Sequence, residues 1–433
     1  MKHVTWTLVC VACSASYPGD ELRHRCECGG VLDVIHDFDA ATAPIGLAAF
    51  DRRLGSRERE DRSGVWRYRE LVLPVAASDI LCRGEGNTGL YYSPRVAEFT
   101  GVGDLCLKHE GENPTGSFKD RGMTVGVTMA RLHRMDRVAC ASTGNTSASM
   151  ASYAALAGMT AIVFIPEGKI AYGKLCQALA YGALTLQIPG DFDVSMKLVE
   201  EVCAEEGVYL LNSVNPFRIE GQKAIGFELL QDMKWEVPDW IVVPGGNLGN
   251  GSAIIKGLRE LRDLELIDRL PRLAVIQAEG ANPLYTAYTE GHDLTPMDDP
   301  DTLATAIKIG NPVSWRKSLR AIRETDGIVD QVSDEEILEA KAVVDAAGVG
   351  AEPASCATVA GIRSLVEKGI MDANSRVAAV LTGHLLKDPD IVVGYHTRKI
   401  EAMACGRANA PIQVEATASS VAAAIRKARP LGG

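Results

Sequence analysis

The chain has 433 residues, of which 46% are hydrophobic and 23% are charged, and its formal net charge is −11. This length exceeds one ordinary hydrophobic core and predicts two domains with appended segments. Basic residues form no cluster and no apolar run reaches the ~18 residues of a membrane helix, so we expect neither nucleic acid nor a membrane as partner. The eleven cysteines, an odd number mostly scattered singly, are typical of the reducing cytoplasm.

The first 38 residues contain four of these cysteines in two close pairs, C-x-x-C and then C-x-C before two glycines. The pairs are Cys10 with Cys13 and Cys26 with Cys28. Two such pairs on short turns can present four thiolates tetrahedrally, which predicts a zinc-ribbon-like segment over residues 1–38. The zinc would be structural, because four protein ligands leave no open position. Unpaired core cysteines, or a site lost from an ancestral ribbon, are the alternative, and His24 is a conceivable substitute ligand.

Beyond about residue 80, apolar strand-like runs alternate with helical patterns, whereas residues 55–63 are charged and read as an exposed connection. Strands are expected at 161–166, 240–246, 273–280 and 377–384, and helices at 251–264, 334–348 and, in the tail, 416–430. The alternation predicts an α/β fold with mostly parallel strands, in which ligands bind beyond the carboxyl ends of the strands.

A lysine in an unusual setting lies in "GENPTGSFKDRGM" (111–123). Ser117 is a good N-cap, and Asp120 three residues later completes a box-like pattern, so Lys119 is expected in the first turn of a helix. The positive end of the helix dipole would lower its pKa and favour a neutral amine. Neutral lysine amines attack carbonyls, most commonly in a Schiff base with pyridoxal phosphate. A helix start whose lysine points to water is the alternative.

The segment "STGNTSAS" (142–149) follows the short apolar run "RVACA" and precedes a helical pattern. A strand–turn–helix here would offer hydroxyls, an amide and unpaired backbone N–H groups together, which suits a carboxylate ligand. The alternative is a plain polar connection.

The segment "GGNLGN" (245–250) follows an expected strand and precedes an expected helix. Its backbone N–H groups could surround a single phosphate. It lacks the pattern of a P-loop and of a dinucleotide fingerprint. A bare glycine turn is the alternative.

The segment "LTGHLLKDPD" (381–390) ends the last strong strand. It would place the hydroxyl of Thr382 at a carboxyl end of the sheet. No intrinsic feature distinguishes it from a structural loop.

These four segments, in this order, resemble the threonine synthase family of pyridoxal-phosphate enzymes, whose fold is shared with the tryptophan synthase β subunit. The likeness runs from about residue 80 to 396 and includes "EGNTGL" (85–90) and "EPAS" (352–355). It implies a two-domain α/β PLP fold type II and a homodimer. The implied segments are the ribbon (1–38), a connection with the start of the large domain (39–110), a small domain (111–222), the large domain (223–400) and a C-terminal extension (401–433).

The resemblance also implies a role for each matching residue. Lys119 would hold the cofactor and shuttle protons, Asn145 would bond the ring hydroxyl, and Thr382 would meet the pyridine nitrogen. The cofactor phosphate would lie on Gly246, Asn247, Leu248, Gly249 and Asn250. The substrate carboxylate would lie on Ser142, Thr143 and Thr146, and the substrate phosphate on Asn212, Ser213, Arg218 and the Asn247 side chain.

The implied reaction converts O-phospho-L-homoserine and water to L-threonine and phosphate. Three departures from the family pattern, Gly89 for proline, Leu248 for alanine and Leu385 for glycine, leave room for a changed substrate. The alternative is a related enzyme acting on another phosphorylated amino acid, such as O-phosphoserine with sulfite in the manner of cysteate synthase. A non-catalytic cofactor-binding or ribbon interaction protein would have lost Lys119 or the glycine loop, and neither is lost.

Overall fold

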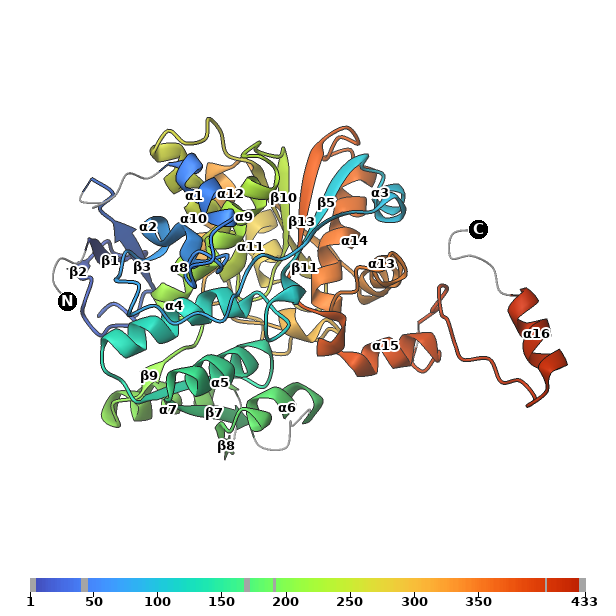
Figure 1. Cartoon of the computed structure of the whole chain (residues 1–433), viewed down its shortest axis with the longest axis horizontal. Helices are drawn as coiled ribbons and strands as arrows, with labels where there is room; N and C mark the ends of the chain where they lie inside the picture. The colour runs from blue at the N-terminus through green and yellow to red at the C-terminus, as the bar shows by residue number, and fades with distance from the viewer. Residues whose placement is uncertain (1–4, 40–45, 167–171, 190–191, 402, 428–433) are drawn as a thin grey trace.

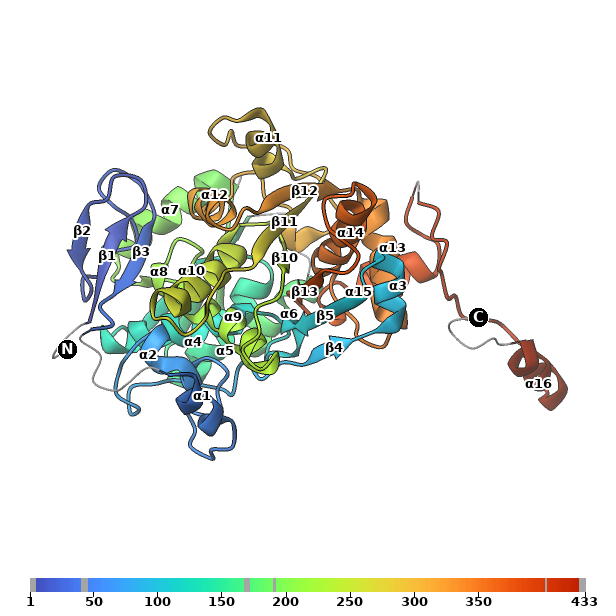
Figure 2. The same cartoon turned by 90° about the horizontal axis from the view of Figure 1, so that it is seen from above.

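The computed structural model describes residues 5–39, 46–166, 172–189, 192–401 and 403–427, which form three sheets with helices packed around them (Figures 1 and 2). The α/β fold expected from the sequence is confirmed. Within these ranges, no helix combines the length and apolar composition needed to cross a membrane. The domain boundaries expected from the sequence stay a prediction.

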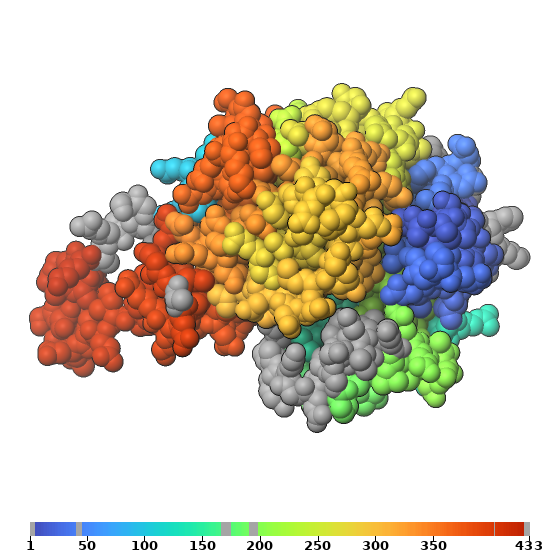
Figure 3. Space-filling model, turned by 180° about the vertical axis from the view of Figure 1, so that it is seen from behind, coloured from blue at the N-terminus to red at the C-terminus, as the bar shows by residue number. Residues whose placement is uncertain are grey.

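The N-terminal sheet is a small antiparallel ribbon in the order β2-β1-β3. Its strands are β1 (Trp6–Cys10), β2 (Ser16–Pro18) and β3 (Leu32–His36). The inward side chains Leu8 and Val34 are fully buried and join the main hydrophobic core. The ribbon therefore packs against the body, as the space-filling view also shows (Figure 3).

The second sheet is parallel and has the order β8-β7-β6-β9. Its strands are β6 (Arg137–Ala141), β7 (Thr160–Pro166), β8 (Leu184–Ile188) and β9 (Tyr209–Leu210). The accompanying helices are α4 (Lys119–Leu132), α5 (Asn145–Ala157), α6 (Tyr172–Ala180), α7 (Phe192–Glu205) and α8 (Pro216–Gln222). Helices α5 and α7 both contact β6 and β7.

The third sheet has the order β12-β11-β10-β13-β5-β4, and only β4 runs antiparallel. Its strands are β4 (Leu90–Tyr92), β5 (Asp104–His109), β10 (Trp240–Pro244), β11 (Arg272–Ala278), β12 (Ile328–Val332) and β13 (Arg376–Leu381). Along β10, Ile241 and Val243 join one core cluster while Trp240 and Val242 join another. Both faces of this strand are buried, which explains its uninterrupted apolar run.

The remaining helices surround the large sheet or precede it. They are α1 (Leu47–Leu54), α2 (Arg69–Val72), α3 (Pro94–Thr100), α9 (Ala224–Asp232), α10 (Gly249–Asp263), α11 (Pro283–Glu290), α12 (Trp315–Glu324), α13 (Asp334–Ala346), α14 (Pro353–Glu367) and α15 (Pro389–His396). Short 3₁₀ turns lie at Trp66–Tyr68, Glu110–Glu112, Thr305–Ile307 and Leu385–Lys387.

The C-terminal extension ends in α16 (Ala418–Lys427), which stands apart from the body and buries none of its residues (Figures 1 and 2). The tail helix expected at 416–430 is thus found, and residues 428–430 of that prediction lie outside the described ranges. Val421 and Ile425 are exposed on it.

A buried ion network links the start of α4 to β5, to the 3₁₀ turn that follows it and to α9. Arg121 donates to both oxygens of Glu110 at 2.6 Å and to Glu228 at 2.8 Å. Lys108 lies 2.8 Å from the same Glu228 carboxylate. Each charge has an opposite partner, as groups excluded from water require. The network fixes the helix that begins at Lys119.

Candidate active site

A cavity of about 720 Å³ opens where β6, β10 and β13 end. It is lined by all fourteen residues for which the resemblance implies a cofactor or substrate contact. They are Lys119, Ser142, Thr143, Asn145, Thr146, Asn212, Ser213, Arg218, Gly246, Asn247, Leu248, Gly249, Asn250 and Thr382. The carboxyl ends of strands from both parallel sheets thus meet in one site, as expected for α/β folds.

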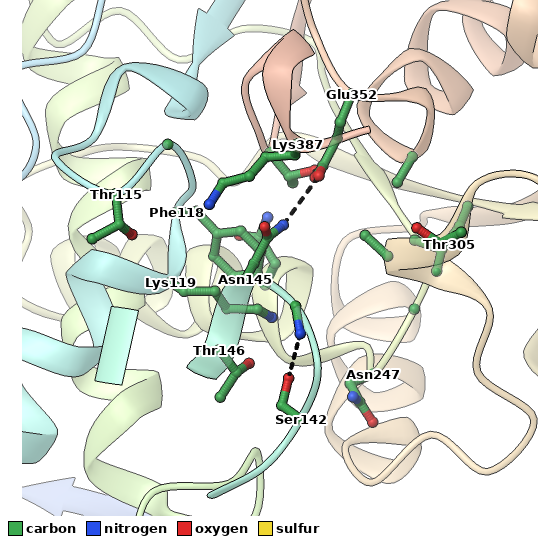
Figure 4. Close-up of a pocket in the computed structure, with 18 of the residues that line it drawn as sticks. Thr115, Phe118, Lys119, Ser142, Asn145, Thr146, Asn247, Thr305, Glu352 and Lys387 are labelled. Atoms are coloured by element: carbon green, nitrogen blue, oxygen red, sulfur yellow. Dashed lines mark hydrogen bonds between the residues drawn. The ribbon is translucent and has the colours of Figure 1, made fainter. Parts of the chain in front are cut away.

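Lys119 begins α4, and its amine lies 4.1 Å from the centre of the Phe118 ring (Figure 4). The pKa of Lys119 is lowered from 10.5 to about 7, chiefly by burial and also by the nearby Arg218 guanidinium, against the opposing effect of Glu352. The expected neutral amine is therefore favoured. Its main cause is loss of water rather than the helix dipole suggested by the sequence.

The expected capping box at Ser117 is wrong. The N-cap of α4 is Phe118, without a side-chain bond, and the Ser117 hydroxyl is buried with no partner. Ser117 instead pairs through its backbone with Gly383. Asp120 accepts from the backbone N–H of Thr115 at 2.7 Å and from its hydroxyl at 2.6 Å. Contacts across the chain therefore replace the local cap.

The turn before α5 is built around Gly144, the N-cap of that helix. Its N–H donates to the Ser142 hydroxyl at 3.3 Å, and the Asn145 amide donates to Glu352 at 3.0 Å (Figure 4). The N-terminal N–H groups of α5, together with the hydroxyls of Thr143 and Thr146, therefore border the cavity.

The glycine loop joins β10 to α10. Leu248 has a left-handed φ of +65°, uncommon for a residue with a side chain, and is buried. A Cβ on Gly246 would lie 3.2 Å from the Ala306 carbonyl oxygen, so a side chain there would crowd the loop. Both polar atoms of the Asn250 side chain are buried without partners. A loop with these unpaired groups at a helix N-terminus fits a phosphate.

Arg218 on α8 is 1% exposed. Its Nη1 donates to the Leu211 carbonyl at 3.0 Å, whereas Nε and Nη2 have no partner. Burial lowers its pKa to about 10, which leaves it charged at neutral pH. A buried guanidinium with two unpaired donors facing a cavity indicates an anionic ligand.

Asn212 and Ser213 lie beside this arginine in the cavity wall. The Asn212 amide accepts from the backbone N–H of Ala141 at 2.9 Å and donates to its carbonyl at 3.1 Å. This side chain therefore holds the end of β6, in addition to any contact with a substrate.

Thr382 follows β13, and its hydroxyl lies 3.0 Å from the Ser355 hydroxyl and 3.3 Å from the Glu352 carboxylate. No role was predicted from the sequence for Glu352, Lys387 or Gln222, all of which line the cavity, with Lys387 pointing into it (Figure 4). The first two lie inside the motifs "EPAS" and "LTGHLLKDPD", so the motifs themselves were the available signal.

Two of the three departures from the family pattern have local explanations. The N–H of Gly89, which proline would lack, donates to Glu112. Leu385 packs against Gly350: a Cβ added to Gly350 would lie 2.3 Å from the Cδ2 atom of Leu385. Gly350 also has a left-handed φ of +71°. Gly350 therefore provides the room that the leucine occupies.

The four cysteines of the ribbon lie together, with all their sulfurs within 4.8 Å of one another. Two of the Sγ–Sγ distances are 3.6 Å (Cys10 to Cys28) and 3.5 Å (Cys13 to Cys26). Tetrahedral zinc with Zn–S bonds near 2.3 Å separates its sulfurs by about 3.8 Å. His24 is not part of this cluster, so the alternative ligand considered from the sequence is not favoured.

Comparison with known proteins agrees with this geometry. A family model described as pyridoxal-phosphate dependent enzyme matches residues 81–383. The chain belongs to this family. A threonine synthase of Methanocaldococcus jannaschii is 46% identical over 386 residues, which cover 89% of this chain and 93% of that one. One from Methanosarcina acetivorans is 48% identical over 389 residues, with the same coverage.

Relatives of known structure share the fold at much lower identity. The Escherichia coli threonine synthase structure matches with a TM-score of 0.66 at 16% identity, covering 89% of this chain and 90% of that one. Maize serine racemase matches with a TM-score of 0.63 at 18% identity, covering 82% and 98%. At these identities the likeness concerns the fold.

Proposed function

We propose that this enzyme is a threonine synthase, which converts O-phospho-L-homoserine and water to L-threonine and phosphate. One observation carries the proposal: a buried arginine, Arg218, has two unpaired donors in the cavity that also contains the low-pKa Lys119 and the glycine loop. Two separate anion sites beside one reactive lysine suit a cofactor phosphate and a substrate phosphate. Curated threonine synthases at 42–48% identity support the same reaction.

The residues present fit pyridoxal phosphate. The loop from Gly246 to Asn250 would hold its phosphate, Asn145 and Thr382 would hold its ring, and Lys119 would hold it covalently. When bound, the cofactor supplies an electron sink that lets protons leave carbon. The Thr382 hydroxyl would be a neutral partner for the ring nitrogen, and this hydroxyl lies 3.3 Å from the Glu352 carboxylate.

Lys119 is suited to move protons because its pKa of about 7 lies near neutral pH. An amine with this pKa can accept a proton and release it again with little free-energy cost in either direction. The hydrophobic Phe118 beside it helps to exclude water from the amine. One base can therefore serve successive proton transfers.

The two ends of the substrate would be held by different kinds of group. Ser142, Thr143 and Thr146, with the first N–H groups of α5, would bind the carboxylate by neutral hydrogen bonds. Arg218 would bind the phosphate through Nε and Nη2 and stabilise its charge as it departs.

A phosphate-release assay with purified enzyme tests the proposal. O-phosphohomoserine, O-phosphoserine and O-phosphothreonine are offered separately, and we expect turnover of the first. Turnover of O-phosphoserine with sulfite, and none of O-phosphohomoserine, would favour the cysteate synthase-like alternative. Lys119→Ala should abolish both turnover and the visible absorbance of lysine-bound cofactor. A retained band would mean that another lysine holds it.

We further propose that the four cysteines of the ribbon bind one structural zinc ion. Two sulfur–sulfur distances near those of a tetrahedral site support this. Metal analysis of enzyme purified without chelator should give about one zinc per chain. A zinc content far below one ion per chain would contradict the proposed zinc site.

We also propose that the enzyme is a cytoplasmic homodimer. None of the eleven cysteines, all of which lie within the described residues, forms a disulfide bond, which suits a reducing compartment. Exposed apolar side chains on and near the C-terminal extension, including Val393 and Ile425, suit a second subunit. Light scattering of the purified protein should give twice the mass of one chain.

A further inference from the structure

Helix α8 presents two different faces. Arg218 and Gln222, one turn apart, line the cavity. The Oε1 atom of Gln222 is buried and has no partner, like the two free donors of Arg218. Glu220 and Lys223, by contrast, are fully buried in a network of charges outside the cavity. The helix therefore connects an anion site with an ion network.

The network begins with the ribbon strand β3. The Nε2 atom of His36 lies 2.6 Å from Glu220 Oε2, and the two side chains are 2% and 0% exposed. Glu220 also pairs with Lys223 at 2.6 Å and, through its other oxygen, with Lys256. Lys223 in turn lies 2.6 Å from Glu260 on α10. The ribbon histidine is thus a direct partner of the carboxylate that anchors α8.

A second ribbon residue, Asp33, pairs with charges on α12 and also reaches Lys256 of α10. Asp33 lies 2.6 Å from Arg320 and 3.2 Å from Lys317 on α12, and 3.7 Å from Lys256. Helix α12 follows Ser314, whose N–H donates to the Asn247 carbonyl of the glycine loop at 3.2 Å. The ribbon is therefore linked by buried charges to both elements that form the anion sites.

We propose that the ribbon braces the substrate-phosphate site and that His36 is a positioning residue for Arg218. A guanidinium must be held within about 0.5 Å of its productive position to bind and stabilise a phosphate. Within the described residues the Arg218 guanidinium makes one hydrogen bond, to the Leu211 carbonyl, so the placement of α8 decides where its two other donors point. The Glu220 carboxylate fixes α8 two residues further on, and His36 fixes that carboxylate. This inference rests on the proposed function in taking the anion at Arg218 as the phosphate of the substrate.

The test compares His36→Leu, which removes the hydrogen bond, with His36→Gln, which keeps a donor. Ile35→Thr is the control, because Ile35 is the neighbouring exposed residue of β3. Steady-state kinetics with O-phosphohomoserine and calorimetric titration of the holoenzyme with inorganic phosphate give KM, kcat and the phosphate Kd. We expect His36→Leu to raise KM and Kd about tenfold and also to lower kcat, since a misplaced Arg218 guanidinium would bind the phosphate less tightly and stabilise its departure less well. His36→Gln should recover most of the loss.

Unchanged KM and Kd in His36→Leu would overturn the proposal that His36 positions Arg218. This holds even if the thermal stability of the variant falls, because a purely structural role of His36 predicts only a loss of stability. If His36→Leu does not fold, Arg320→Met replaces it, since Arg320 is half-exposed and binds Asp33 at the edge of the network. A Kd for phosphate unchanged in that variant would also overturn the proposal. Failure of the proposed function is distinguishable, because the phosphate titration needs no turnover.

Discussion

The lowered pKa of Lys119 makes a quantitative prediction about how the apoenzyme captures its cofactor. Only the neutral amine attacks the aldehyde of pyridoxal phosphate. With a pKa of about 7, half of the Lys119 amines are neutral at pH 7, whereas an amine with the ordinary value of 10.5 would be neutral in about one molecule in 3,000. Covalent capture at pH 7 should therefore be about a thousandfold faster than an unperturbed lysine in the same position would allow.

The assay mixes apoenzyme with pyridoxal phosphate and follows the absorbance of the lysine-bound cofactor at a series of pH values. The rate should rise about tenfold per pH unit below pH 7 and level off above it, because Lys119 is then fully neutral. The rate with a free lysine derivative in solution corrects for titration of the cofactor itself. A corrected rate that still rises between pH 8 and pH 10 would refute the reasoning.

Two substitutions should move this midpoint in opposite directions. Arg218→Met removes a positive charge that lowers the pKa of Lys119, so the midpoint should move to higher pH. Glu352→Gln removes the carboxylate that raises this pKa, so the midpoint should move to lower pH. Lys368→Met is the control, because Lys368 is exposed, pairs with Asp330 at 2.7 Å and does not line the cavity. Shifts of the same sign in the first two variants would contradict the electrostatic account.

Two further predictions concern stability. Glu228→Gln should lower the free energy of unfolding in urea by about 3–5 kcal/mol, because Arg121 and Lys108 are left buried beside a neutral amide; a loss below about 1 kcal/mol would show that the network is not needed. Gly350→Ala should lower the melting temperature, since its Cβ would lie 2.3 Å from Leu385 Cδ2, and Leu385→Gly in the same chain should recover part of the loss. No recovery in the double variant would leave the left-handed backbone of Gly350 as the sole cause.

The three neighbouring strands β11, β10 and β13 of the large sheet were predictable from sequence because they are buried on both faces. The run expected at 240–246 became β10 (Trp240–Pro244), and the run at 377–384 became β13 (Arg376–Leu381). Uninterrupted apolar residues followed by glycine or threonine mark such strands and their ligand-binding ends. The glycine loop and Thr382 could be located for the same reason.

The start of α4 could not be predicted, because contacts between distant residues determine it. Ser117 is drawn into backbone pairing with Gly383, and Asp120 accepts a hydrogen bond from Ser149, 29 residues along the chain. The local pattern of a capping box describes neither contact. Similarly, the reason for Gly89 lies in Glu112, 23 residues away.

The role of Glu352 could not be predicted from the sequence for a related reason. This residue precedes α14, and its carboxylate reaches the site only because Gly383 has no side chain; a Cβ there would lie 2.4 Å from the Glu352 carboxyl carbon. Sequence shows both residues but not their contact. The structure shows the carboxylate within hydrogen-bond distance of Asn145 and Thr382, the two side chains expected at the cofactor ring.

The three consecutive charged residues at the start of α4 explain how a lysine beside an acid keeps a neutral amine. Successive residues of a helix point about 100° apart, so Lys119, Asp120 and Arg121 enter three different surroundings. The Asp120 carboxylate accepts hydrogen bonds from Thr115 and Ser149, and the Arg121 guanidinium forms ion pairs with two carboxylates in the core. Lys119 therefore gains no ion pair from its neighbours in the sequence, and among the charges that act on its pKa in the described structure the only acid is Glu352. Had Asp120 faced the cavity instead, its negative charge would have raised the pKa of the amine and reduced the neutral fraction on which capture of the cofactor depends.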